Sequence, residues 1–90
     1  MKKYSVKIQK SAQKALKQLD RPVEERILEW LKNTLEGCEN PRLQGKPLHG
    51  NLKGNWRYRV GKYRIVADIQ DDKVLIVVID VDKRNDIYKN

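Results

Sequence analysis

Two arginines flank a two-residue turn near the middle of the chain. Arg59 and Arg64 lie on either side of the dipeptide Gly61-Lys62, between runs that alternate apolar and polar residues. This pattern is typical of a tight β-hairpin. The turn sets the register of the hairpin and places Arg59 directly opposite Arg64. Two neighbouring guanidiniums form a binding site for an anion such as a phosphate, which would offset their mutual repulsion.

The predicted hairpin has two different surfaces, because side chains alternate between the faces of a strand. One surface carries Arg57, Arg59 and Arg64 and is expected to be a basic platform, whereas the other is apolar and is expected to face the core. Like charges in facing positions cost about 0.2 to 1 kcal/mol. The arginine pair therefore favours ligand binding over a purely structural role. The predicted facing pairs are Val60 and Tyr63, Arg59 and Arg64, Tyr58 and Ile65, Arg57 and Val66, and Trp56 and Ala67.

Charge is distributed unevenly along the chain, which has a formal net charge of +8. The segment 41–67 contains seven basic residues and no acidic one, and the segment 1–19 contains six lysines and no acidic one. The twelve carboxylates lie in two blocks, 20–39 and 68–86. A regional positive field is typical of proteins that bind nucleic acids or acidic proteins. The alternative interpretation is a lysine-rich surface that only keeps a small protein in solution.

Ninety residues predict one domain, 1–90, with a single small core. The lone Cys38 cannot form an internal disulfide, which favours a reducing compartment, and we expect a cytoplasmic protein. One histidine and scattered carboxylates match no recognised metal-ligand spacing, so we expect neither a metal nor a cofactor. Apolar runs are far shorter than the roughly 18 residues that span a bilayer, so we expect no membrane partner.

Hydrophobic spacing predicts the elements of the first half. Alternation over residues 4–8 predicts a short strand, and Ser11 is the expected N-cap of an amphipathic helix that ends near residue 20. Pro22 suits the first turn of a second helix, which Gly37 ends. The short link between these helices predicts an antiparallel helical hairpin.

The second half is predicted to be mainly β-structure. Residues 38–54 form a basic loop or edge segment, and the arginine hairpin follows directly. The nearly all-aliphatic run 74–81 predicts an inner strand covered on both faces, and the polar tail 82–90 is predicted to be helical. The expected fold is α+β: an N-terminal strand, an antiparallel helical hairpin packed on one face of a mostly antiparallel sheet, and a short C-terminal helical tail.

The stretch PLHGNLKGNWRYRVGKYRIV (47–66), followed by a strand and then DKRNDIY (82–88), resembles the RelE family of type II toxins within the RelE/ParE superfamily. The resemblance covers essentially the whole chain. It implies a metal-independent, ribosome-dependent endoribonuclease that cleaves mRNA in the A site and arrests translation. It also implies two kinds of partner, the ribosome with its mRNA and a cognate acidic, RelB-like antitoxin.

The resemblance also implies roles for individual residues. Arg64 and Arg84 match the family's phosphate-binding arginines and are assigned to the scissile phosphate. Arg57 and Arg59 stand where well-studied members carry lysines. Because a guanidinium stays protonated, we assign both to stabilising the phosphate and the leaving oxygen rather than to base catalysis. Tyr88 matches the family's terminal tyrosine and is expected to stack on a base or to transfer a proton, with closure of the core edge as its alternative role.

The proton acceptor stays open between Tyr88, Lys53 and the ribosome. The single histidine, His49, is more often structural in a loop of this kind, and Lys83 stands where many relatives carry a histidine before the arginine. Further RNA contacts are expected from the lysines of the basic segment and from one strand arginine. These residues are Lys46, Lys53, Lys62 and Arg57.

Two other functions remain in view. A ParE-like toxin of the same fold would inhibit DNA gyrase and leave mRNA intact. A basic domain without catalysis would bind only RNA or an acidic protein. The full set of arginines together with a terminal tyrosine favours the ribonuclease.

Overall fold

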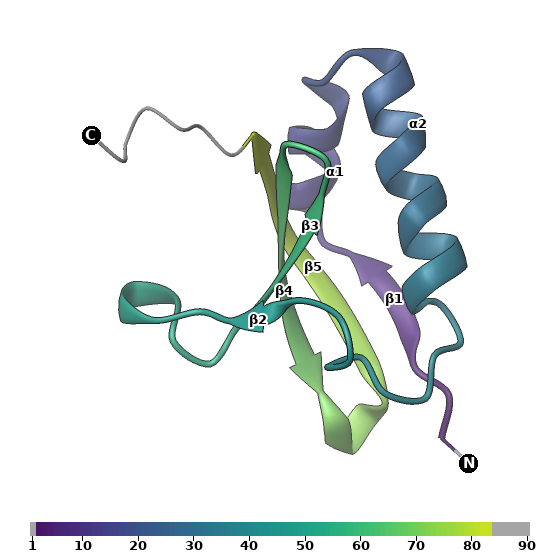
Figure 1. Cartoon of the computed structure of the whole chain (residues 1–90), viewed down its shortest axis with the longest axis vertical. Coiled ribbons are helices and arrows are strands. Elements are labelled where there is room, and N and C mark those ends of the chain that lie inside the picture. Colours follow the sequence, from purple (N-terminus) through teal and green to yellow (C-terminus); the bar gives the residue numbers. More distant parts are fainter. Residues whose placement is uncertain (1, 84–90) are drawn as a thin grey trace.

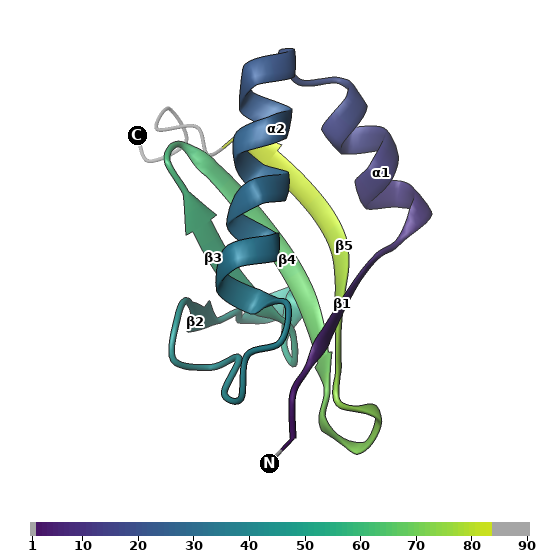
Figure 2. The ribbon, with the colours of Figure 1, turned by 90° about the vertical axis from the view of Figure 1, so that its right-hand side faces the viewer.

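Two helices pack on one face of a five-stranded sheet in this computed structural model, which describes residues 2–83 (Figure 1). The strand order is β1-β5-β4-β3-β2. When the molecule is turned by 90°, α2 crosses in front of the sheet and α1 lies next to β5 (Figure 2). The elements are β1 (Ser5–Ile8), α1 (Lys10–Lys17), α2 (Arg21–Trp30), β2 (Lys46–Pro47), β3 (Trp56–Val60), β4 (Tyr63–Gln70) and β5 (Leu75–Lys83).

The pairing of the strands confirms the predicted α+β fold. Strand β1 runs parallel to β5, and the three other pairs are antiparallel. The loop or edge segment expected at 38–54 contains the short edge strand β2. The helical tail predicted for 82–90 lies outside the described residues, apart from its first two positions, which belong to β5.

Helix α1 begins earlier than the sequence predicts. The backbone N–H of Gln9 still donates to the carbonyl of Val78, so strand pairing continues up to the residue before the helix. Gln9 is therefore the N-cap, and the prediction of Ser11 as the N-cap was wrong. The Ser11 hydroxyl instead donates to the carbonyl of Ile79 at 2.7 Å. This bond ties the first turn of α1 to β5.

Helix α2 follows the predicted pattern. A proline occupies its first turn, where the missing N–H costs nothing. A π-helical turn, Leu31–Leu35, continues the helix. The chain then leaves through Gly37 at a φ of +82°, a conformation that glycine adopts without strain. Ile27, Leu31 and Leu35 point inward and are buried.

The arginine hairpin forms with the predicted register, including the Arg59–Arg64 pair. On its core face, Tyr58 and Ile65 are fully buried. The Trp30 ring of α2 lies 5.6 Å from the Tyr58 ring, measured between centroids. Packing against the helix layer therefore fixes one face of the hairpin, so the arginines must occupy the other face. We call that face, which is turned away from α1 and α2, the second face.

Strand β5 is an inner strand, as predicted, but it is not covered on both faces. Only one face of its aliphatic run is buried, whereas Val77 and Ile79 on the second face are half-buried. The run is also not regular, because a bulge shifts the register next to Ile79. An extra residue reverses which side chains face the core. After the bulge Val81 points inward, while Asp80 and Asp82 point to the second face.

A polar cluster pins the loop after α2 to the far end of the sheet. Both terminal nitrogens of Arg42 donate to the Asp71 carboxylate at 3.0 Å, and the Tyr4 hydroxyl donates to it at 2.7 Å. The Arg42 guanidinium also lies 5.9 Å from the centre of the Trp56 ring. The bonds from Arg42, and then the bond from Tyr4, hold the pKa of Asp71 below its usual range.

We expect Asp71→Asn to lower the melting temperature at neutral pH and to weaken its dependence on acid. Because the folded pKa is lowered, the stabilisation is complete above the ordinary value of 3.8 and is lost as the pH falls through the folded value. Thermal melts from neutral pH to about pH 2 measure this effect, with Asp72→Asn as the matched control. Equal pH dependence of the Asp71 variant and the wild type would contradict the assignment.

Candidate nucleic-acid interface

The second face brings the three hairpin arginines together, as predicted from strand alternation. Arg59 on β3 is exposed and faces Arg64 on β4. Arg57 is half-buried, and the edge strand β2 places Lys46 beside it. The β2–β3 side of the sheet therefore presents a row of positive charge. Arg59 is the most accessible of the three arginines.

Two of the predicted RNA-binding lysines lie beyond the ends of this row. Lys53 belongs to the loop before β3, and Lys62 belongs to the turn after it. Both are exposed. The five residues of β3 lie between them, a span of roughly 17 Å at 3.3 to 3.4 Å per residue. His49 and Lys53 belong to the same loop. This loop, between β2 and β3, projects from the edge of the sheet (Figure 1).

The second face is not purely basic, which corrects the sequence prediction. Arg64 forms a two-point ion pair with Asp82 of β5: its Nε lies 3.2 Å from one carboxylate oxygen, and its Nη2 lies 2.9 Å from the other. Asp80 is exposed on the same strand and face. The bulge in β5 is the physical cause, because it turns both acidic residues toward the arginines. The bulge could not be predicted from the sequence, because residues 74–79 are all aliphatic and do not indicate which side chains face the core.

The ion pair between Arg64 and Asp82 also affects the repulsion between Arg59 and Arg64. A carboxylate in the same cross-strand row offsets the repulsion between Arg59 and Arg64, so the fold does not depend on a bound phosphate. The Arg64 and Asp82 side chains are 23% and 43% exposed. Solvent screening at such exposure limits a pair of this kind to about 1 kcal/mol or less.

The remaining predicted residues, Arg84 and Tyr88, lie outside the described residues. The last described residue is Lys83, which ends β5 opposite Tyr63 and next to the hairpin turn. Within residues 2–83, no group of three or more His, Cys, Asp or Glu side chains could hold a metal ion. No helix in the same range is long and apolar enough to cross a membrane.

The chemistry available on the second face is the binding and stabilisation of negative charge. Guanidiniums donate hydrogen bonds in a planar fork that matches phosphate oxygens, and they remain protonated at any physiological pH. Arg59 offers its donors to solvent, and Arg64 is oriented by its partner. The arginines on this face therefore suit a phosphodiester but do not provide a general base.

Fold and site together define a small basic α+β protein whose sheet is suited to binding a polyanion. The family profile described as "ParE toxin of type II toxin-antitoxin system, parDE" matches residues 6–88. Toxin RelG of Mycobacterium tuberculosis is 31% identical to the chain over 86 residues, which are 96% of this chain and 97% of the relative. The chain therefore belongs to the RelE family of type II toxins.

Solved structures support the same assignment. The toxin–antitoxin complex RelBE2 from Mycobacterium tuberculosis contains a chain that matches with a TM-score of 0.82 and 29% identity, covering 91% of this chain and 99% of that one. The isolated Escherichia coli RelE toxin matches with a TM-score of 0.70 and 28% identity, covering 96% of this chain and 92% of that one. These likenesses extend over nearly the whole chain.

Proposed function

We propose that residues 1–90 form one RelE-like toxin domain that cleaves mRNA in the ribosomal A site without a metal ion. The observation that carries this proposal is the pairing of exposed Arg59 with oriented Arg64 on the second face. Membership of the RelE family supports it. Lys46 beside Arg57 extends the positive row along which an RNA backbone would lie.

In the proposed reaction the 2′-hydroxyl of the mRNA loses a proton and attacks the adjacent phosphorus. The bond to the 5′-oxygen breaks, and that oxygen takes up a proton. Arg64, together with Arg84, would neutralise the charge that builds on the phosphate oxygens, and Arg59 and Arg57 would stabilise the phosphate and the leaving oxygen. Tyr88, Lys53 or the ribosome would accept the first proton.

The requirement for a ribosome follows from the limits of this chemistry. Guanidiniums stabilise charge but do not remove a proton, because they stay protonated. An enzyme with this site gains most from a substrate whose 2′-hydroxyl, phosphorus and leaving oxygen are already aligned. The decoding site of the ribosome would supply that alignment.

Two alternatives each have one supporting observation. The ParE description of the matching profile favours a DNA gyrase inhibitor of the same fold. The engagement of Arg64 by Asp82 favours a basic domain that binds RNA or an acidic protein without cleaving it. Both alternatives predict intact mRNA on translating ribosomes.

We expect Arg64→Ala to abolish mRNA cleavage on programmed ribosomes, with a loss of about 100-fold or more, because a cation aimed at the reacting phosphate is removed. Toe-printing with wild-type protein and the variant side by side measures the cuts. The matched control is Lys14→Ala, which removes an exposed positive charge from α1 in the helix layer. Cleavage by the Arg64 variant at the wild-type rate would refute the role of Arg64, and uncut mRNA with wild-type protein would refute the ribonuclease.

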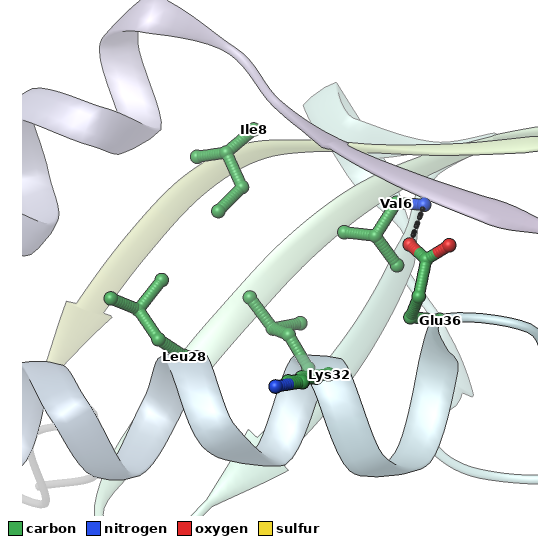
Figure 3. Close-up of a pocket in the computed structure, with 6 residues that line it drawn as sticks. Val6, Ile8, Leu28, Lys32 and Glu36 are labelled. Carbon is green, nitrogen blue, oxygen red and sulfur yellow. Dashed lines mark hydrogen bonds between the residues drawn. The ribbon is translucent and has the colours of Figure 1, made fainter.

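An apolar groove between α2 and β1 supports the second part of the proposal, an acidic antitoxin as partner. The groove has a volume of about 180 Å³ and is lined by apolar side chains with one lysine and one glutamate at its rim (Figure 3). Strand β1 forms the edge of the sheet here, and the Glu36 carboxylate accepts a hydrogen bond from the Val6 N–H at 2.8 Å. The groove is lined by Val6, Ile8, Leu28, Leu31, Lys32 and Glu36.

The groove suits an amphipathic helix or an extended strand of such an antitoxin. Apolar side chains of the partner would cover Leu28 and Ile8, and its acidic residues would meet Lys32. The matching chain in the RelBE2 structure belongs to a toxin–antitoxin complex, which supports a partner of this class for the present chain.

We expect Leu28→Glu to prevent co-purification of the antitoxin encoded beside this chain, because it places a negative charge in the groove. Leu28 is 37% exposed, so the fold should tolerate the change. Leu43→Glu is the matched control, since Leu43 is 78% exposed in the loop after α2. Co-purification is measured by tagged pull-down from cells that express both proteins. Equal recovery of the antitoxin with both variants would exclude the groove as the docking site.

A further inference from the structure

An acidic residue of the second face is paired directly with Arg64. Asp82 lies at the end of a cross-strand row formed by Arg59 on β3, Arg64 on β4 and Asp82 on β5. Its two carboxylate oxygens accept hydrogen bonds from Nε and Nη2 of Arg64 at 3.2 and 2.9 Å. Arg64 therefore has a like charge on one side and its counter-ion on the other.

The geometry of this contact leaves part of the Arg64 guanidinium available. A guanidinium has five N–H donors. Asp82 takes two of them along the Nε–Nη2 edge, so three remain, on Nη1 and Nη2. The Nη1–Nη2 edge is itself a two-point site for phosphate oxygens. Asp82 can therefore hold Arg64 while Arg64 holds a phosphate.

The same contact fixes the orientation of the guanidinium plane. Two parallel hydrogen bonds to one carboxylate fix the plane of the guanidinium, whereas a single hydrogen bond or a distant charge leaves it free to rotate. Without Asp82, the nearest charged neighbour of Arg64 in its row would be Arg59, and repulsion would turn the side chain away from it. Because Arg64 is still 23% exposed, it has room to turn.

We propose that Asp82 is a positioning residue that holds Arg64 in the orientation needed to stabilise the scissile phosphate. This inference rests on the proposed ribonuclease function. Asp82 itself does not contact the RNA. Its carboxylate would repel a nearby phosphate, so its benefit lies in preorganisation of Arg64 rather than in RNA affinity.

The opposite role for Asp82 makes the opposite prediction. If Asp82 only masked Arg64, its removal would strengthen RNA binding and increase cleavage. Positioning instead predicts a lower kcat with a KM that is unchanged or lower, because a negative charge is removed from the binding face. The two roles are therefore separated by the direction in which kcat changes.

The test compares Asp82→Ala with Asp82→Glu and Asp80→Ala in steady-state cleavage of mRNA on programmed ribosomes. We expect Asp82→Ala to lower kcat about 10- to 100-fold, as misplacement of a catalytic group does. Asp82→Glu retains both acceptor oxygens and should restore kcat. Asp80→Ala removes the same charge from the same strand and face without touching Arg64, and should leave kcat at the wild-type value.

A second readout does not depend on cleavage. This readout is the NMR signal of the Arg64 Nε–H proton, which is assigned by its absence in Arg64→Lys. In the wild type this proton should be protected from exchange with solvent. In Asp82→Ala its signal should shift or disappear. If the wild type is active and Asp82→Ala changes neither kcat nor the Arg64 resonance, the positioning role of Asp82 is overturned and the proposed ribonuclease function is not affected. Increased cleavage by Asp82→Ala would overturn it in favour of masking. Absence of cleavage by the wild type would overturn the proposed function and this inference with it.

Discussion

The cross-strand register of the β3–β4 hairpin is the constraint on which the rest of the site depends. Tyr58 and Ile65 are fully buried against the helix layer, so the alternation of side chains leaves Arg59 and Arg64 no position except the second face. A slip of one residue would bury the guanidiniums and expose the core. The same hydrogen-bonded ladder therefore sets both the packing of the core and the placement of the arginines.

Charge on the second face changes sign across the sheet. The β2–β3 side is basic through Lys46, Arg57 and Arg59, whereas β5 contributes acidic side chains, and Arg64 lies between the two regions. A polyanion would thus be attracted to the basic side of the sheet and repelled from the acidic side. This gradient would align an RNA backbone along β3 and bring it to Arg64 from the side opposite the carboxylate.

Local spacing predicted the hairpin register and the two helices, and the order of the elements predicted the α+β class. The family was predicted from the resemblance of the chain to RelE toxins. Tertiary contacts decided the rest. Ser11 looked like an N-cap, but its hydroxyl bonds to Ile79 of β5 instead. The nearly all-aliphatic run 74–81 contains no sign of a bulge, so the acidic side of the second face was not predicted. The available signal was the alternation Asp80-Val81-Asp82 at the end of this run, and only the register shows to which face the two acidic residues point.

Binding of RNA by the second face is tested by the salt dependence of affinity for a short, 2′-O-methylated single-stranded RNA. Fluorescence anisotropy measures this affinity for the wild type, Arg59→Ala and Lys14→Ala. Affinity falls as salt rises, and each phosphate contact that is lost makes the negative slope of log affinity against log salt shallower by about 0.7. We expect Arg59→Ala to bind the RNA more weakly and with a shallower slope, and Lys14→Ala to bind it as the wild type does. If only Lys14→Ala lowered the affinity for RNA, the RNA would bind to the helix layer, and binding by the second face would be contradicted.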